Sequence, residues 1–396
     1  MKVEYHHLKP SQQFHIANAE LGHEADLVLY FASPDILESS DVYHTIKRAY
    51  PSAQLLGCST GGEMTMDDAC EGTAVVSAIA FETTKIQCVS AIFESDDDSF
   101  NAGARLGAKF EQEGLKAIFL LSDGLNVNGS AIIRGIQSII GKSIPITGGL
   151  AGDGSRFKKT YVGLNQNPTQ RNMAAVGFYG DDFHLGYGAY AGGEPFGPFR
   201  SITKSKGNVV YEIDNEPALD LYKSYLGKFV DDLPASALFF PMIIASPDAK
   251  EDLVVRTVLA VDEGENSLTF AGDMPQGYIT RLMLARKDHF LKGAQIAAEL
   301  VDWDHEPIGH TLAILVSCIG RKLSMSEHVV EEVDVVREHF NKEDSCDYVQ
   351  MGFFSYGEIC PHRLSNVSEL HNETMTISLM YETHGQRSNQ LPHNGA

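Results

Sequence analysis

The sequence lacks the patterns that mark several common classes of protein. Its six cysteines form no CxxC pair, which excludes a zinc ribbon and a covalently attached c-type haem and fits reduced thiols in a cytosol. No uninterrupted apolar run reaches the length of a transmembrane helix, and the polar residues 1–7 lead into no apolar signal-peptide core. We therefore expect a soluble, cytoplasmic protein without a membrane partner.

Positive charge is also scarce. The 396 residues include 31 Lys and Arg against 53 Asp and Glu, which gives a net charge of -22. Nucleic acids and anionic membranes bind through basic patches, so this balance argues against either as the main partner. Hydrophobic residues make up 43% of the chain, which is enough to form packed cores. The chain is longer than a domain with a single hydrophobic core usually is, so its length predicts two domains.

Strand-like and helix-like segments alternate along the chain. Buried strands are expected at residues 25–32 and 116–122, and helical spacing follows them at 34–50 and 130–140. Alternation of this kind, with glycine at the strand ends, is typical of layered α/β domains. We therefore predict an α/β fold of two layered halves.

Glycine turns recur in both halves of the predicted fold. Ala-Gly-Asp occurs at 151–153 and again at 271–273. Internal duplication would explain this recurrence, and so would chance similarity between glycine turns. We place the two halves at residues 20–200 and 201–382, and a loose polar tail at 383–396.

The loop at residues 57–63, Gly-Cys-Ser-Thr-Gly-Gly-Glu, is the first candidate for contact with a ligand. Its glycines can bring backbone N–H groups close to a small molecule. The loop lacks the GK[ST] ending of a Walker loop and does not read GxGxxG. A carboxylate or another small polar group therefore suits it better than a phosphate, and a tight turn after a strand is the alternative without a ligand.

Catalysis finds little support in the sequence. Cys58 as a nucleophile would need a base that is held by a third group, and no such spacing is recognisable. Asp123 and Asp153 lie in glycine loops and could form a carboxylate pair, although Asp in such loops commonly caps its own backbone. We therefore expect no enzymatic activity, with Cys58 or the Asp123/Asp153 pair as the alternative.

Three further polar groups follow predicted strands in the second half. Arg321 could hold a ligand carboxylate by a two-point contact, or it could pair with one of the many acidic residues. Glu358 and His371 lie in two segments, 352–359 and 369–376, that flank runs expected to be buried strands. Polar groups set among strands in this way can line a pocket for a small molecule.

Five segments together resemble FIST-domain proteins, in the order of a FIST N-terminal half followed by a FIST C-terminal half. They are residues 57–63, 148–154, 317–321, 354–359 and 369–376. The resemblance covers about residues 20 to 382. It implies an intracellular sensor of small ligands that takes part in signal transduction.

A chain of this length without a fused output domain is similar to a FIST subgroup of haem-containing nitric-oxide sensors, which act on histidine kinases or cyclic-di-GMP enzymes. The resemblance thus implies haem as cofactor, and His371 is the candidate axial ligand because it lies inside a family segment. An amino acid or carboxylate held by Arg321 and the loop amides is the alternative ligand. The expected ligand-binding residues are Cys58, Ser59, Thr60, Gly149, Asp153, Arg321, Tyr356, Glu358, His371 and Asn372.

Overall fold

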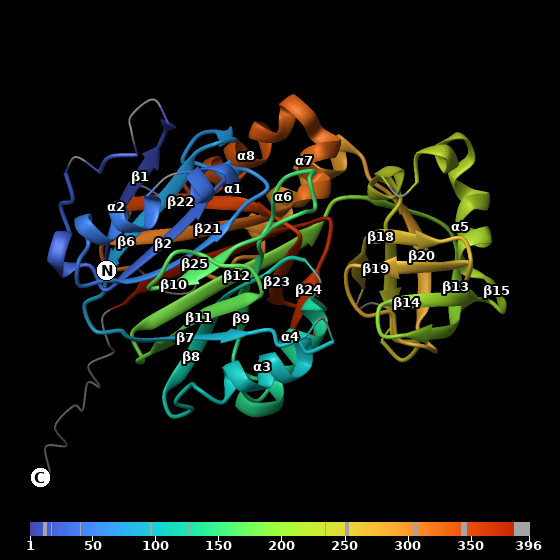
Figure 1. Ribbon diagram of the computed structural model, residues 1–396, viewed down its shortest axis with the longest axis horizontal. Coiled ribbons are helices and arrows are strands. Elements are labelled where there is room, and N and C mark those ends of the chain that lie inside the picture. Colours follow the sequence, from blue (N-terminus) through green and yellow to red (C-terminus); the bar gives the residue numbers. More distant parts are fainter. Residues whose placement is uncertain are drawn as a thin grey trace, which may run out of the picture.

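The protein consists of a large body of three mixed sheets, with a smaller β-barrel unit at one side (Figure 1). The computed structural model describes residues 1–383, except for 11–13, 17, 40, 96, 126, 234, 250–252, 304–306 and 342–346. The barrel, residues 194–285, is inserted between β12 (Phe183–Ala191) and α6 (Lys287–Glu299) of the body. The tail predicted at 383–396 lies outside the described residues, apart from Thr383.

The body repeats one supersecondary unit three times. In each copy, two neighbouring strands run parallel and are joined by a crossover that contains helix, as parallel pairing requires. The parallel pairs are β2 (Leu27–Ala32) with β3 (Gln54–Ser59), β8 (Leu115–Ser122) with β9 (Ile146–Leu150), and β21 (His310–Cys318) with β22 (Asp347–Ser355).

After its second parallel strand, each unit sends a strand to the sheet of the preceding unit. This strand pairs with β22, β3 or β9, and it is followed in two units by a further short strand. The strands are β4 (Glu63–Met64) and β5 (Ala69–Cys70), β10 (Val162–Leu164), and β23 (Gly357–Pro361) and β24 (Ser368–His371).

The next strand of each unit returns to its own sheet and pairs with the first parallel strand. The returning strands are β6 (Ala74–Ala80), β11 (Asn172–Tyr179) and β25 (Thr374–Glu382). Each of them also pairs with a strand from another part of the chain: β1 (Lys2–Leu8), β7 (Lys85–Ile92) and β12, respectively. The sheets are thus shared in a cycle, and no unit completes its own sheet.

Helices cover the outer faces of these sheets. They are α1 (Pro34–Ser39), α2 (Val42–Ala49), α3 (Ser99–Gly107), α4 (Gly129–Ile140), α7 (Ile319–Met325) and α8 (Val330–Phe340), together with α6. α4 begins after Asn128, whose side chain accepts a hydrogen bond from the backbone of the first turn, and it ends before Gly141 at φ 86°.

α3 and α4 approach each other closely because glycines face the contact. A Cβ atom at Gly103 would lie 2.3 Å from a backbone oxygen of α4, and one at Gly135 would lie 2.1 Å from a backbone oxygen of α3. Larger side chains at these positions would push the helices apart. The pair therefore forms a rigid wall of the body.

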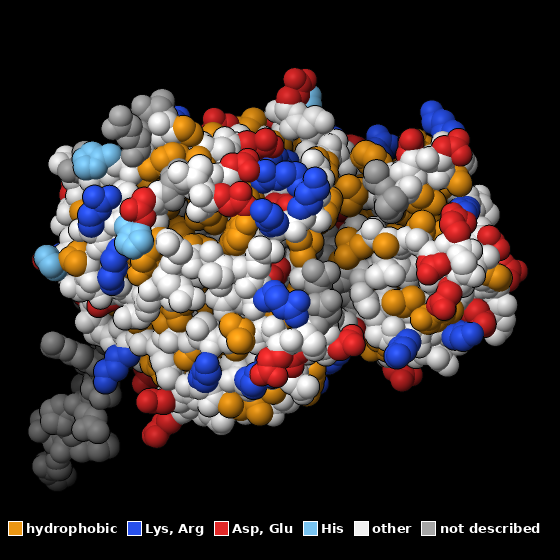
Figure 2. All heavy atoms as spheres, viewed as in Figure 1, with side chains coloured by type: hydrophobic (Ala, Val, Ile, Leu, Met, Phe, Trp, Pro, Cys, Tyr) orange, Lys and Arg blue, Asp and Glu red, His pale blue; other side chains and the backbone are white. Residues whose placement is uncertain are grey.

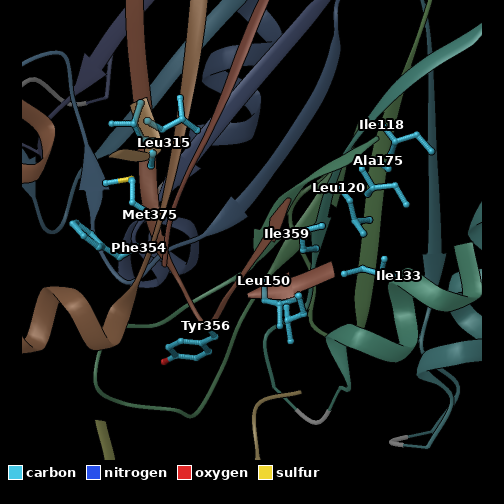
Figure 3. Packing of buried hydrophobic residues seen from close by; sticks show 14 of the residues in the cluster. Ile118, Leu120, Ile133, Leu150, Ala175, Leu315, Phe354, Tyr356, Ile359 and Met375 are labelled. Atoms are coloured by element: carbon cyan, nitrogen blue, oxygen red, sulfur yellow. The ribbon is translucent and has the colours of Figure 1, made fainter. Parts of the chain in front are cut away.

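Apolar side chains fill the space between the sheets and their helices. All six residues of β2 are buried, as expected for a parallel strand that is covered on both faces. In the largest cluster, Leu120, Leu150, Ile133 and Ile359 pack between α4 and the sheet that contains β8 and β9. Phe354 extends this cluster toward the sheet that contains β21 and β22 (Figure 3). This burial supplies the main stabilisation of the body.

The barrel is a strongly curled sheet that closes at Thr257. Its strand order runs from β17 to β18, and these two end strands follow each other in the chain with only Thr257 between them. The elements are β13 (Glu194–Lys206), β14 (Val209–Ile213), β15 (Glu216–Pro217), α5 (Ala218–Leu226), β16 (Met242–Ala245), β17 (Val254–Arg256), β18 (Val258–Asp262), β19 (Ser267–Phe270) and β20 (Ile279–Leu284). Figure 2 shows a narrowed neck where the barrel meets the body.

The α/β class expected from the sequence is confirmed. The Ala-Gly-Asp turn at 151–153 lies in a loop of the second unit of the body, whereas the turn at 271–273 lies in the barrel, so this recurrence does not mark the three equivalent units. The helix expected at 34–50 is divided into α1 and α2, because Asp41 begins a new helix. The division at residue 200 stays a prediction; strands from both sides of it share two sheets of the body. No helix in the described part of the chain has the length and apolar character needed to cross a membrane.

Candidate functional site

Three loops that follow the second parallel strands meet at the centre of the body. They are joined by a cycle of backbone hydrogen bonds. The N–H groups of Gly61, Gly152 and Tyr356 donate to the carbonyl oxygens of Phe354, Ser59 and Leu150, at 2.7, 3.0 and 3.2 Å, respectively. In each loop the accepting residue stands two positions before the donating one, which shows that the three segments are structurally equivalent.

These loops bind one another rather than enclose a large space. A Cβ atom at Gly152 would lie 2.9 Å from the backbone nitrogen of Gly61, and one at Gly149 would lie 2.8 Å from the Val316 side chain. Glycine is needed here because the backbones and neighbouring side chains approach so closely. Close packing is thus one reason for these glycines, and their predicted contact with a ligand stays a prediction.

The structure brings several predicted site residues to this centre. Cys58, Ser59 and Thr60 are fully or almost fully buried at the end of β3. Tyr356 donates hydrogen bonds to the Asp153 carboxylate and to the Gly154 carbonyl oxygen. Ser59 Oγ accepts from a backbone N–H, and Asp153 accepts from two more, so these polar groups are already satisfied within the chain. Their role in ligand binding stays a prediction.

Neither alternative catalytic arrangement shows an activated group. Burial raises the pKa of the Cys58 thiol well above its ordinary value, and a negative charge on Glu63 acts in the same direction, so the nucleophilic thiolate is disfavoured. Asp123 accepts hydrogen bonds from Thr160 Oγ1 and from the backbone N–H groups of Leu125 and Arg171. This pattern is that of a loop-capping carboxylate.

Glu63 and Glu358 occupy equivalent positions in two of the three units. Each is fully buried and accepts a hydrogen bond from the hydroxyl three residues earlier, Thr60 or Ser355, and from a backbone N–H at the start of the returning strand. Burial raises the pKa of Glu63 to about 7 and that of Glu358 well above its ordinary value. The repeat therefore holds two protonatable carboxyl groups in the core.

Glu63 makes the stability of the folded protein decrease as the pH rises. Its folded-state pKa of about 7 lies above the ordinary 4.5, so its contribution to stability is complete below pH 4.5 and is lost as the pH rises through about 7. A difference of this size corresponds to about 3 kcal/mol. We expect the thermal midpoint of Glu63→Gln to fall less than that of the wild type between pH 5 and pH 8.5.

The exposed Glu113→Gln variant is the control for this measurement, because Glu113 lies on the surface. Its pH profile should follow the wild type. Parallel profiles for the wild type and Glu63→Gln would show that Glu63 is ionised in the folded state without cost.

Arg321 lies in a buried cluster of charges at the start of α7. Its guanidinium pairs with Glu332 at 2.5 Å, donates to the backbone carbonyls of Phe290 and Glu373, and stacks over the Phe290 ring. The Glu373 carboxyl, between β24 and β25, has a pKa raised to about 8 by burial. Arg321 is thus engaged within the chain, and its proposed hold on a ligand carboxylate stays a prediction.

His371 does not fit the geometry of an exposed axial haem ligand. It is buried, its Nε2 lies 3.0 Å from the Cys360 carbonyl oxygen, and its ring stacks on His362. Burial lowers the pKa of His371 to about 3, so the ring is neutral and donates from Nε2. Neither described cavity is lined by His371 or by its neighbour Asn372. The surrounding residues therefore do not fit a haem bound through this histidine.

The larger described cavity lies between the barrel and the body, away from the central loops. Its volume is about 540 Å³, within the range of small-molecule sites. The walls come from α4 and β24 of the body, and from β16, β17 and the segment 273–278 of the barrel. Phe100, Ile133, Val254 and Tyr278 supply apolar surface, and charged side chains supply the rest.

Arg256 is the most unusual group in this cavity wall. It is 4% exposed, and its Nε and Nη1 donate to the carbonyl oxygens of Asp273, Val255 and Leu370. Among the residues that the structure describes, none forms a hydrogen bond with its Nη2 and no carboxylate forms an ion pair with it. Burial lowers the pKa of Arg256 below its ordinary value, while Glu369 and Asp273 act in the opposite direction. A buried cation in this state favours an anion beside it.

Other charges in the cavity complete an amphoteric site. Glu369 and the exposed Lys142 also line the cavity. Neither of them forms a hydrogen bond or an ion pair with a described residue. Arg134 also lines it and pairs with Asp273 of the barrel. The wall thus offers an unpaired carboxylate and an unpaired guanidinium on neighbouring elements.

Two features of the sequence point to residues of this cavity, although less clearly than the glycine loops point to a shared site. Arg256 stands inside the apolar run at 253–261. Burial of a charged side chain in a strand of this kind is costly, so a charged residue here indicates a specific role. Asp273 ends the second Ala-Gly-Asp turn. Neither signal shows that residues 256 and 369 meet, because that contact depends on how the barrel seats on the body.

Comparison with known families identifies the class of the protein. A family model described as FIST N domain matches residues 26–216, and one described as FIST C domain matches residues 218–361. The chain therefore belongs to the FIST family. FIST domains are sensor domains of signal transduction that respond to small ligands, and this chain holds both of them.

Individual relatives add little beyond the family. An uncharacterized protein of Methanocaldococcus jannaschii, MJ1623, is 24% identical over 398 residues, covering 90% of this chain and 74% of the relative. Cyanuric acid hydrolase from A. caulinodans aligns over 97% of this chain and 99% of its own, with 8% identity and a TM-score of 0.36. A second cyanuric acid hydrolase structure covers 96% and 99%, with 8% identity and a TM-score of 0.31. Structural likeness at this level carries no argument about activity.

Proposed function

We propose that this FIST protein senses a small carboxylate, with an amino acid as the best-fitting class, in the cavity between the barrel and the body. The observation that carries the proposal is Arg256, a buried guanidinium on the cavity wall without a carboxylate partner among the described residues. A ligand carboxylate would accept a charge-assisted hydrogen bond from its free Nη2. The ligand would thereby place a carboxylate directly against the guanidinium, beside the charges of Glu369 and Asp273, which act on Arg256 without forming an ion pair with it.

Glu369 favours an amino group on the same ligand. Its carboxylate lies in the cavity wall next to Leu370, whose carbonyl oxygen binds Arg256. An ammonium group would meet Glu369 while the carboxylate meets Arg256. The chemistry proposed is binding without bond cleavage, because neither Cys58 nor Asp123 shows the features of an activated catalytic group.

A thermal-shift screen with paired compounds tests this function. Each L-amino acid is compared with the carboxylic acid of the same side chain that lacks the amino group. We expect at least one amino acid to stabilise the protein, by about 2.7 kcal/mol at a hundredfold excess over its Kd, and its deaminated partner to act more weakly. Absence of any shift with both compound sets would contradict carboxylate sensing.

Haem-based nitric-oxide sensing, implied by the family subgroup, is the competing proposal. It requires an axial ligand other than His371 in its present geometry. An absorption spectrum of protein expressed with added haem precursor decides the matter: an intense Soret band that persists in His371→Ala would support haem held elsewhere. The output partner, a histidine kinase or a cyclic-di-GMP enzyme, stays a prediction from the resemblance, as does the cytoplasmic location.

A further inference from the structure

Asp273 joins the barrel to the body at the edge of the proposed ligand cavity. Its carboxylate accepts a hydrogen bond from Asn128 Nδ2 at 2.6 Å and forms an ion pair with Arg134. Its backbone N–H contacts Ser130 Oγ at 3.4 Å, and its carbonyl oxygen accepts from Arg256 Nε at 3.2 Å. One barrel residue is thus held by three residues of the body and by the cavity arginine.

The position of Asp273 also suits a negative charge. Asn128, Ser130 and Arg134 belong to the N-terminal cap and first two turns of α4, a helix of 12 residues. The exposed N–H groups at a helix start carry partial positive charge and attract carboxylates. Asp273 therefore adds a favourable electrostatic contact between two parts of the protein.

Among the described residues, further polar contacts join the barrel to the body on this side of the neck. Arg256 donates to the Leu370 carbonyl oxygen, and His362 lies 3.1 Å from the Leu253 carbonyl oxygen. Polar contacts between two parts of a chain permit relative motion more readily than a large apolar interface does. A change at Asp273 would consequently alter how firmly the barrel is seated.

Resting on the function proposed above, we infer that Asp273 is an internal carboxylate latch that a ligand carboxylate displaces. Arg134 and Arg256 both line the cavity and both contact Asp273. A ligand anion in the cavity competes with the Asp273 side chain for Arg134 while it neutralises Arg256. Release of the latch frees the barrel from α4, and this movement is the change that an output partner reads.

Hydrogen exchange of the ligand-free protein tests the latch without knowledge of the ligand. In Asp273→Asn we expect amides in residues 128–134 and 270–276 to exchange at least about threefold faster than in the wild type. Arg134→Gln removes the opposite partner and should give the same pattern. Asp214→Asn is the matched control, because Asp214 pairs with Arg200 within the barrel at 3.0 Å, and it should leave both segments unchanged.

Displacement by a carboxylate is tested with sodium acetate against sodium chloride at equal ionic strength. Acetate should accelerate exchange in the same two segments of the wild type and have no further effect on Asp273→Asn. Unchanged exchange in both Asp273→Asn and Arg134→Gln would overturn the latch. Equal effects of acetate and chloride would overturn its displacement by carboxylate. Failure of carboxylate sensing appears separately, as a lack of stabilisation by every compound in the thermal screen.

Discussion

Arg256→Met abolishes stabilisation by the amino acid or carboxylate that protects the wild type, with an increase in Kd of about thirtyfold or more. The ligand loses the charge-assisted hydrogen bond to Nη2 and the cation that balances its charge. The fold itself should change in stability by only about 1–2 kcal/mol. Arg256 has no ion pair with a described residue, so the loss of its bonds to carbonyl oxygens is offset by the removal of a buried charge.

Isothermal titration with the compound found in the thermal screen measures the Kd, and a denaturant titration measures stability. Lys206→Met is the matched control, because Lys206 is an exposed cation on the barrel and its loss should leave both quantities unchanged. Ligand binding by Arg256→Met with wild-type affinity would remove the cavity as the sensing site. A loss of binding that accompanies global unfolding would be distinguished by the denaturant curve.

Arg321→Met destabilises the protein by about 3–5 kcal/mol. The substitution leaves Glu332 buried without its cation, next to a cluster that also contains Glu358 and Glu373. Uncompensated carboxylates in this interior must become protonated or draw in water, and either change costs stability. Arg321 thus balances a charge of the protein itself, whereas Arg256 is proposed to bind a charge of the ligand.

Urea denaturation at pH 7 measures this loss. Arg286→Met is the control, because the ion pair of Arg286 with Asp288 is more than half exposed on both sides and exposed ion pairs contribute little to stability. The same denaturation at pH 5 measures how the loss of stability depends on pH. A loss below about 1 kcal/mol at both pH values would show that the cluster does not depend on its guanidinium.

The general fold was accessible from the sequence because it depends on local signals. Strands at 25–32 and 116–122 and the helix at 130–140 follow from hydrophobic spacing and glycine ends, and the structure has them within a few residues. Grouping of strands into three sheets was not accessible, because pairing of β4 with β22 or β9 with β23 joins residues far apart in the chain. Local periodicity contains no information about such partners.

The glycine loops show how one sequence pattern can have two physical reasons. Residues 57–63, 148–154 and 354–359 do meet in space, as a shared site would require. Their glycines serve close contacts with neighbouring backbones and side chains, however, and the larger described cavity lies where the barrel meets α4 and β24. A small residue needed for packing and one needed for a ligand give the same sequence pattern.

The cyclic exchange of strands has a consequence for how the protein can be divided. A cut near residue 217, between the two family matches, would strip β22 and β23 from their partners β4 and β9 and β25 from β12. Both fragments would expose unpaired edges and be prone to aggregate. In the part of the chain that the structure describes, the strands of the barrel pair only with one another, so removal of the barrel would leave the strand pairing of the three body sheets in place.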